Sequence, residues 1–191
     1  MFFEKNNQKG ASLVEVLGVL TIISLIGTAT LKLVTNSYGL FKQSMVTSEI
    51  TELQKIISGN YCFSGEYEID DTPANFYKKI CEKDKTAPNQ MCLKSGGSYV
   101  LKHRLGGNVK IEKKENSGYS IEFENINRRA CVSLSQIDWL QRRKTNIYQL
   151  DINNVAVAYY PKKGNKSFPL TVNNSITGCN KDINTIKWYF Y

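Results

Sequence analysis

Residues 9–27 read KGASLVEVLGVLTIISLIG. The apolar run begins at Ala11 and continues to about Val34, and a helix of that length, rising about 1.5 Å per residue, spans roughly 36 Å. Such a helix is long enough to cross a bilayer with some tilt. One acidic residue, Glu15, lies inside the run, although a carboxylate at the centre of a membrane helix costs about 2.5 kcal/mol or more. The run therefore predicts a membrane segment in which Glu15 has a specific function.

The residues before the run differ from a conventional secretory signal. Residues 1–10 are short and mostly polar, with Lys5 and Lys9 and no apolar core of their own. A conventional signal is cleaved after its apolar region, at small residues in an Ala-x-Ala-like pattern. Residues 27–30, GTAT, match that pattern poorly. We therefore expect cleavage before the apolar run rather than after it.

Residues 9–15, KGASLVE, resemble the N-terminal signal of type IV pilins and of the related pseudopilins of type II secretion. The resemblance implies that a prepilin peptidase removes residues 1–10 as a leader peptide by cutting between Gly10 and Ala11. It also implies methylation of the new amine of Ala11, with Glu15 as the fifth mature residue. Two departures leave the subclass open, because Ala11 stands where the commonest pilins have Phe and because no Pro interrupts the apolar run.

The resemblance also gives Glu15 a role in assembly. In a filament core, the cationic N-terminus of an adjacent subunit can neutralise this carboxylate. A buried ion pair is favourable only when both partners are present and well placed, so Glu15 would act as a check on the axial register of the subunits. Cohesion of the filament would come from apolar side chains of the same helix. These assembly residues are Leu13, Val14, Val16, Leu17, Leu20, Ile23 and Ile26.

Helical periodicity continues beyond the apolar run. Apolar residues recur at three- and four-residue steps over residues 41–57, with charged residues between them, and Gly59-Asn60 is a stop signal. We predict one continuous helix over residues 11–58. Residues 11–34 form its transmembrane and assembly half, and residues 35–58 form an amphipathic half that packs on a globular head.

The head, residues 59–191, is predicted to be α+β. Period-two alternation and turn residues after residue 97 indicate an antiparallel β-sheet. A long N-terminal α-helix packed on such a sheet is the pilin fold that the resemblance implies. The predicted strands are residues 98–105, 109–114, 119–124, 147–152, 155–160 and 183–191. The predicted short helices are residues 74–81 and 135–142, and residues 162–174 are predicted to form a polar loop.

The head contains five cysteines, namely Cys62, Cys81, Cys92, Cys131 and Cys179. No Cys-x-x-Cys occurs and the chain has a single histidine, so a zinc site is not expected, whereas an exported domain would use cysteines in disulfides. We expect a local bridge between Cys81 and Cys92. The resemblance to pilins implies a second bridge between Cys131 and Cys179, which would bound a C-terminal region of residues 131–179. Because the number is odd, at least one cysteine stays outside such bridges.

The net charge of +8 on 191 residues indicates a basic surface. Such a surface can attract DNA or an anionic membrane, but no stretch carries the block of about five to eight Lys and Arg residues that is typical of a nucleic-acid patch. His103 is the single histidine, and a lone histidine is far more often a packing or surface residue than a catalyst. The sequence shows no Ser/His/Asp set, phosphate loop or metal-ligand cluster. We therefore expect neither an enzyme nor a cofactor or metal.

These observations predict a structural subunit of a type IV pilus-like filament. The precursor would be a single-pass protein of the bacterial inner membrane, and the mature chain would form an extracellular surface filament. Its expected partners are copies of itself, the prepilin peptidase and the pilus assembly machinery, with DNA or a host surface as further partners that no motif specifies. Adhesion, motility, aggregation and DNA uptake all stay open as roles. The alternatives are a minor pilin or type II secretion pseudopilin and, in another class, an uncleaved membrane-anchored binding module.

Overall fold

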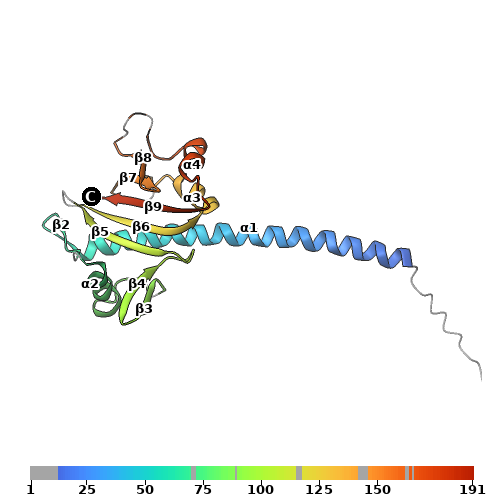
Figure 1. The fold of residues 1–191 in the computed structure, drawn as a ribbon, viewed down its shortest axis with the longest axis horizontal. Helices are drawn as coiled ribbons and strands as arrows, with labels where there is room; N and C mark the ends of the chain where they lie inside the picture. The colour runs from blue at the N-terminus through green and yellow to red at the C-terminus, as the bar shows by residue number, and fades with distance from the viewer. Residues whose placement is uncertain are drawn as a thin grey trace, which may run out of the picture. The chain divides into compact units, whose positions relative to one another are not determined.

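The computed structural model describes residues 13–69, 72–88, 90–114, 118–141, 146–161, 164 and 166–191. The chain divides into two compact units, residues 1–40 and 41–191. The helices are α1 (Leu13–Asn60), α2 (Pro73–Lys78), the π-helical turn η1 (Lys79–Lys83), α3 (Arg128–Ser135) and α4 (Val172–Gly178). The strands are β1 (Cys62–Phe63), β2 (Glu66–Tyr67), β3 (Cys92–Ser95), β4 (Ser98–Lys102), β5 (Asn108–Lys114), β6 (Gly118–Asn127), β7 (Ile147–Ile152), β8 (Val155–Tyr159) and β9 (Ile183–Phe190), as Figure 1 shows.

Helix α1 is the long N-terminal helix that the sequence predicts. It ends at Asn60, slightly beyond the predicted end at Ser58, and residues 11 and 12 of the predicted helix lie outside the described residues. Within the second unit, the apolar stripe of this helix is buried in the core of the head. The stripe consists of Val46, Ile50, Leu53 and Ile57. Because most helical stability comes from burial of such a face, the head stabilises this part of α1.

Seven antiparallel strands form the main sheet of the head, in the order β3-β4-β5-β6-β9-β7-β8 (Figure 1). The C-terminal strand β9 lies inside this sheet, because it pairs with β6 on one side and with β7 on the other. Its side chains alternate between the two faces, and Ile186, Trp188 and Phe190 are buried in the core. The sheet is therefore complete only when the last strand of the chain is in place.

The β7–β8 hairpin turns at Asn153 and Asn154, where the sequence predicts a turn. Both residues have positive φ angles, 53° and 65°, which a tight type I′ hairpin requires and which asparagine tolerates. The side chain of Asn153 also reaches β9, since its amide nitrogen donates to Asn184 Oδ1 at 2.9 Å and its Oδ1 accepts from the Thr185 N–H at 3.1 Å. The turn is thus tied to a neighbouring strand as well as to its own hairpin.

Aromatic rings fill the centre of the core. Trp188 meets Phe123 and Trp139 edge to face, with 5.5 Å between the ring centroids in each pair. Tyr119 stacks on Phe190 at 5.0 Å. Both tryptophans of the chain are fully buried in this cluster, so tryptophan fluorescence reports on the integrity of the head.

The helix predicted over residues 135–142 is wrong. The structure instead has α3 at Arg128–Ser135, and its N-terminus is capped by Asn127, whose Oδ1 accepts from the Ala130 N–H at 2.9 Å. This cap fixes the start of the helix directly at the end of β6. Trp139 and its apolar neighbours have a helix-like spacing, but they lie in the irregular segment after α3. Tertiary packing of the indole, rather than helical periodicity, explains these apolar residues.

Two other predicted boundaries differ from those in the structure. The predicted strand over residues 98–105 ends at Lys102, because His103 and Gly107 close a turn in which the His103 N–H donates to Gly107 O at 3.0 Å. The predicted polar loop over residues 162–174 overlaps the start of α4, which Thr171 caps by accepting the Asn174 N–H at 3.3 Å. Both changes depend on local hydrogen bonds that hydrophobic periodicity does not encode.

Candidate functional site

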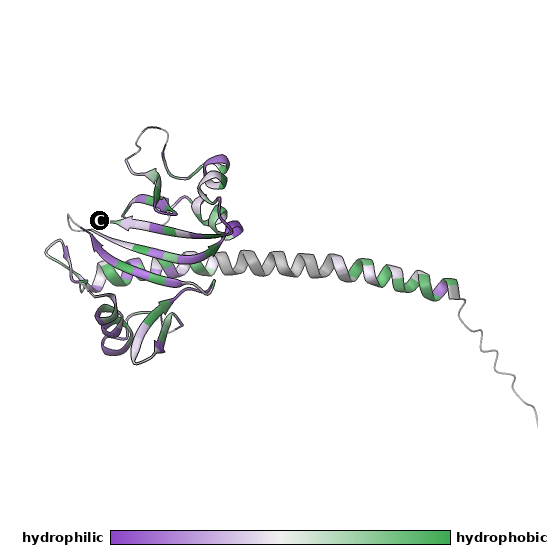
Figure 2. Cartoon of the chain, viewed as in Figure 1, coloured by the Kyte–Doolittle hydropathy of each residue, from purple (hydrophilic) through white to green (hydrophobic). Residues whose placement is uncertain are grey.

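The first described part of α1 carries the predicted assembly residues. Glu15 is exposed, and six of the predicted apolar residues, Val14, Val16, Leu17, Leu20, Ile23 and Ile26, are between 46% and 76% exposed. Three residues outside the predicted set, Val19, Ile22 and Leu25, are exposed to a similar extent. Figure 2 shows this part of the helix as predominantly hydrophobic. Apolar side chains therefore surround the helix on all sides, a surface that marks a protein–protein or membrane contact.

The hydroxyl groups of Thr21, Ser24 and Thr28, within this apolar segment, form hydrogen bonds inside the helix itself. Thr21 Oγ1 donates to the carbonyls of Leu17 at 3.0 Å and Gly18 at 2.7 Å. Ser24 and Thr28 donate in the same way to carbonyls one turn earlier. Such internal bonds allow the hydroxyls to leave water without losing a hydrogen bond. The segment is therefore compatible with burial in an apolar surrounding.

Part of the predicted processing and assembly segment lies outside the residues that the structure describes. The cleavage site between Gly10 and Ala11, and the leader of residues 1–10, fall among residues that the structure does not describe. Leu13 is the first residue of α1, but its side chain is not described. Within the described part of the chain, no helix has both the length and the apolarity required to span a membrane.

Two disulfides join the pairs of cysteines named from the sequence. Cys131, inside α3, is bonded to Cys179 at the C-terminal end of α4, and their Cα atoms are 5.8 Å apart. Cys81 in η1 is bonded to Cys92 at the start of β3. The half-buried Cys62 is free. The first bond closes the region of residues 131–179 and holds α3 against α4.

The sheet face opposite the core carries a charged network across β5, β6 and β9. Lys187 lies at its centre, with its Nζ 2.5 Å from Glu122 and 3.4 Å from Glu112. Glu112 also pairs with Lys114 at 2.9 Å. The network crosses strands that are distant in sequence, so it helps to fix the register of β9 between its neighbours.

Glu49 of α1 is a buried acid that the sequence did not single out. Its side chain is 3% exposed, its Oε2 accepts from the Arg104 N–H at 3.2 Å, and its Oε1 lies 3.4 Å from Arg104 Nε. Burial raises the pKa of Glu49, although the contacts with Arg104 act in the opposite direction. The pair ties the head part of α1 to the turn after β4. A helical position among other charged residues gives no sequence signal that this one is buried.

The family model described as PilS N terminal matches residues 41–190 of this chain. The chain belongs to the PilS family of type IV pilins. The match covers almost the whole second unit, residues 41–191. The assignment to this family therefore rests on the second unit and is independent of the N-terminal motif. This pilin is therefore a structural subunit, as its sequence predicts.

Two solved pilin structures resemble this pilin in fold. The type IVb pilin from Salmonella typhi is 16% identical, with a TM-score of 0.54, over 76% of this chain and 96% of that chain. TcpA, a type IV pilin from Vibrio cholerae El Tor biotype, is 9% identical, with a TM-score of 0.50, over 78% of this chain and 99% of that chain. These likenesses confirm the predicted α+β pilin fold, and at such identities they concern the fold alone. No curated protein matches this pilin in sequence.

The single histidine of this pilin is a packing residue. His103 is buried and stacks on Phe123 with 4.7 Å between the ring centroids. Its Nε2–H donates to Glu124 O at 2.7 Å, and its Nδ1 accepts from the Leu105 N–H at 3.2 Å, so the ring is bonded as the neutral tautomer. A Cβ at Gly107 would lie only 1.8 Å from Glu124 O, so the turn around this ring requires glycine.

We expect the free energy of unfolding of the head to fall as the pH falls below about 6.5, the ordinary pKa of histidine. Burial lowers the pKa of His103, so the unfolded chain takes up this proton at a higher pH than the folded chain does. Urea unfolding between neutral and mildly acid pH, followed by tryptophan fluorescence, measures the effect. A His103→Gln variant should show a flatter pH dependence. Identical slopes for the two proteins would contradict the expectation, because Glu49 and the other carboxylates are common to both.

The acidic groups of this pilin give no sign of a metal site in the part of the chain that the structure describes. Among the described residues, no three His, Cys, Asp or Glu side chains lie close enough together to hold a metal ion. Asp151 accepts hydrogen bonds from Tyr189 at 2.8 Å and from Gln149 at 2.7 Å on the sheet. The bond from Tyr189 connects β9 to β7, whereas the bond from Gln149 lies within β7, so Asp151 has a structural role in the sheet.

Proposed function

We propose that this pilin is the repeating subunit of a type IV pilus-like surface filament, joined through the N-terminal half of α1. The observation that carries the proposal is the apolar surface of residues 14–26, exposed on all sides of the helix in a chain whose head belongs to a pilin family. Burial of apolar surface contributes about 25 cal/mol per Å². Packing copies of this helix side by side would therefore supply the driving force for assembly.

Glu15 sets the geometry of this packing. It is the one charged residue between positions 13 and 28, and the hydroxyls of the same segment are already bonded within the helix. In a helical bundle, the carboxylate would need a cationic partner, and the processed N-terminus of a neighbouring chain at Ala11 supplies one. Subunits in the wrong axial position would leave both charges unpaired, at a cost of several kcal/mol.

We propose the processing route that the N-terminal motif implies. Residues 11–34 would hold the precursor in the bacterial inner membrane, and the prepilin peptidase would cut after Gly10 and methylate Ala11. The pilus assembly machinery would then add the mature chain to the filament. Retention of Glu15 and a complete disulfide region favour a major subunit over a minor pilin or pseudopilin.

The proposal is tested by shearing the surface of the native host and separating the filaments by centrifugation. We expect this chain to be the most abundant protein of the filament fraction, and antibodies against the head to label filaments along their length in electron micrographs. Labelling confined to filament tips would point to a minor pilin. Recovery of the chain only in the membrane fraction, with no labelled filament, would contradict the proposal and favour an anchored binding module.

A further inference from the structure

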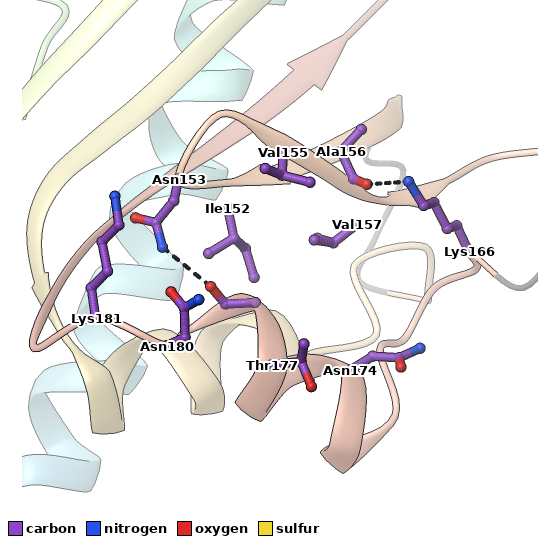
Figure 3. A pocket seen from close by; sticks show the side chains of 11 residues that line it. Ile152, Asn153, Val155, Ala156, Val157, Lys166, Asn174, Thr177, Asn180 and Lys181 are labelled. Carbon is purple, nitrogen blue, oxygen red and sulfur yellow. Dashed lines mark hydrogen bonds between the residues drawn. The ribbon is translucent and has the colours of Figure 1, made fainter.

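A pocket of about 550 Å³ lies beside the β7–β8 hairpin (Figure 3). Most of its lining residues belong to the region that the Cys131–Cys179 bond closes, and Asn180 and Lys181 directly follow that region. Its floor is apolar, and Ile152, Val155 and Val157 line it. Gly178 of α4 keeps the floor open, because a Cβ there would lie 3.1 Å from Ile152 Cδ1. The volume is in the range of sites that hold small organic ligands.

The rim of the pocket is rich in uncharged hydrogen-bonding groups. Asn174 and Thr177 of α4 lie on one side and Asn180 lies on the other, as Figure 3 shows. Asn153 also lines the pocket, but its amide is already bonded within the protein to Gly178, Asn184 and Thr185. Amide and hydroxyl groups both donate and accept hydrogen bonds, as a ligand with several hydroxyls requires. Polar groups around an apolar floor therefore suit a small polyhydroxylated ring with one apolar face.

The charge of the pocket is positive. Lys166 and Lys181 line it, and none of its lining residues that the structure describes is acidic. Lys166 Nζ donates to Ala156 O at 2.7 Å, which holds its ammonium at the edge of the pocket (Figure 3). An ammonium has three donors, so this bond leaves donors for a ligand. The pocket is thus complementary to a ligand that carries a carboxylate.

The ligand is not expected to be a peptide, because residues of the chain already bond to the outer edge of β8. An extended peptide would add to this edge strand through backbone hydrogen bonds. The Ala156 carbonyl is already bonded to Lys166, and Tyr159 forms a parallel bridge with Ser167. The chain's own residues therefore occupy positions along the edge that an added strand would need.

We propose that this pocket binds an acidic monosaccharide, that is, a hexose-sized ring bearing a carboxylate. The carboxylate would contact the ammonium of Lys181, and the hydroxyls would contact Lys166, at the opposite end of the pocket in Figure 3, and the Asn and Thr side chains of the rim other than Asn153. The apolar ring face would lie over Val155. This binding activity goes beyond filament formation and does not depend on it.

The test compares glucuronate with glucose, which has a hydroxymethyl group in place of the carboxylate. Both are titrated into the full chain in mild detergent, and binding is followed by ligand-observed NMR. We expect saturable binding of glucuronate that weakens with salt, and much weaker binding of glucose. Lys181→Gln should weaken glucuronate binding about threefold, as for an exposed charge pair, whereas Lys102→Gln on the distant strand β4 should not.

A matched pair of tryptophan variants tests the location. Val155 lines the pocket and is 60% exposed, whereas Val172 lies outside the lining and is 58% exposed. Val155→Trp should fill the pocket and abolish binding of glucuronate, and Val172→Trp should leave it unchanged. Equal binding of glucose and glucuronate, equal binding of the simple dicarboxylate succinate, or full binding by Val155→Trp would each overturn the proposal. Loss of filaments with glucuronate binding intact would affect the proposed function alone.

Discussion

Replacement of Glu15 by alanine is expected to leave cleavage of the leader intact and to lower the incorporation of the chain into filaments by roughly tenfold or more. In the proposed filament, the variant would keep the apolar surface but would lack the carboxylate that pairs with a neighbouring N-terminal amine. An uncompensated buried charge costs about 3–5 kcal/mol. This cost exceeds the free energy of about 1.4 kcal/mol that corresponds to a tenfold change in an equilibrium constant. The measurement is the amount of this chain in sheared filaments relative to the amount in the membrane.

Glu52→Ala is the matched control for this experiment, since it removes an exposed carboxylate from the same helix within the head. It should assemble as the wild type does. Glu15→Gln, which keeps the shape but not the charge, should fail as Glu15→Ala does. Normal filament yield from either Glu15 variant would refute the role of this carboxylate as an assembly check.

Removal of the disulfide between Cys131 and Cys179 is expected to lower the free energy of unfolding of the head by about 4 kcal/mol. The bond joins residues 48 positions apart, and the chain-entropy model gives a larger effect for longer loops. The bond between Cys81 and Cys92 spans 11 positions, so its removal should cost about 3 kcal/mol. Alanine replaces both cysteines in each double variant, because Cys131 and Cys179 are fully buried and a serine would add an unsatisfied hydroxyl.

Urea unfolding followed by the fluorescence of Trp139 and Trp188 measures these differences, since both indoles are buried in the core. Cys62→Ser is the control, because this thiol forms no disulfide, and it should change the stability little. Equal stability of the Cys131→Ala/Cys179→Ala protein and the Cys62→Ser protein would contradict the expected stabilisation by the Cys131–Cys179 bond.

The elements with strong local signals could be predicted from the sequence. The long helix follows from its continuous apolar periodicity and from the stop at Gly59-Asn60, and the β7–β8 hairpin follows from Asn153-Asn154. The start of α3 was missed, because its cap at Asn127 lies within the end of a strand. The position of β9 between β6 and β7 could not be predicted either, since alternation shows that a segment is a strand but not which strands it joins.

For the candidate site too, residues that are close in sequence could be predicted and residues that are distant in sequence could not. Glu15 and its apolar neighbours are adjacent in sequence, so the N-terminal motif identifies them as one group. The buried contact of Glu49 with Arg104, and the pocket that combines Ile152 with Gly178 and Lys181, join residues that are distant along the chain. Only the folded head brings such residues together, and no spacing rule in a single sequence indicates them.

The most direct test of the central claim is the mass of the N-terminal peptide of this chain in filaments sheared from the surface of the native host. If this pilin is processed and assembled through its N-terminal helix, the peptide begins at Ala11 and carries one added methyl group. A chain that still begins at Met1, or that begins after the apolar run, would contradict the account.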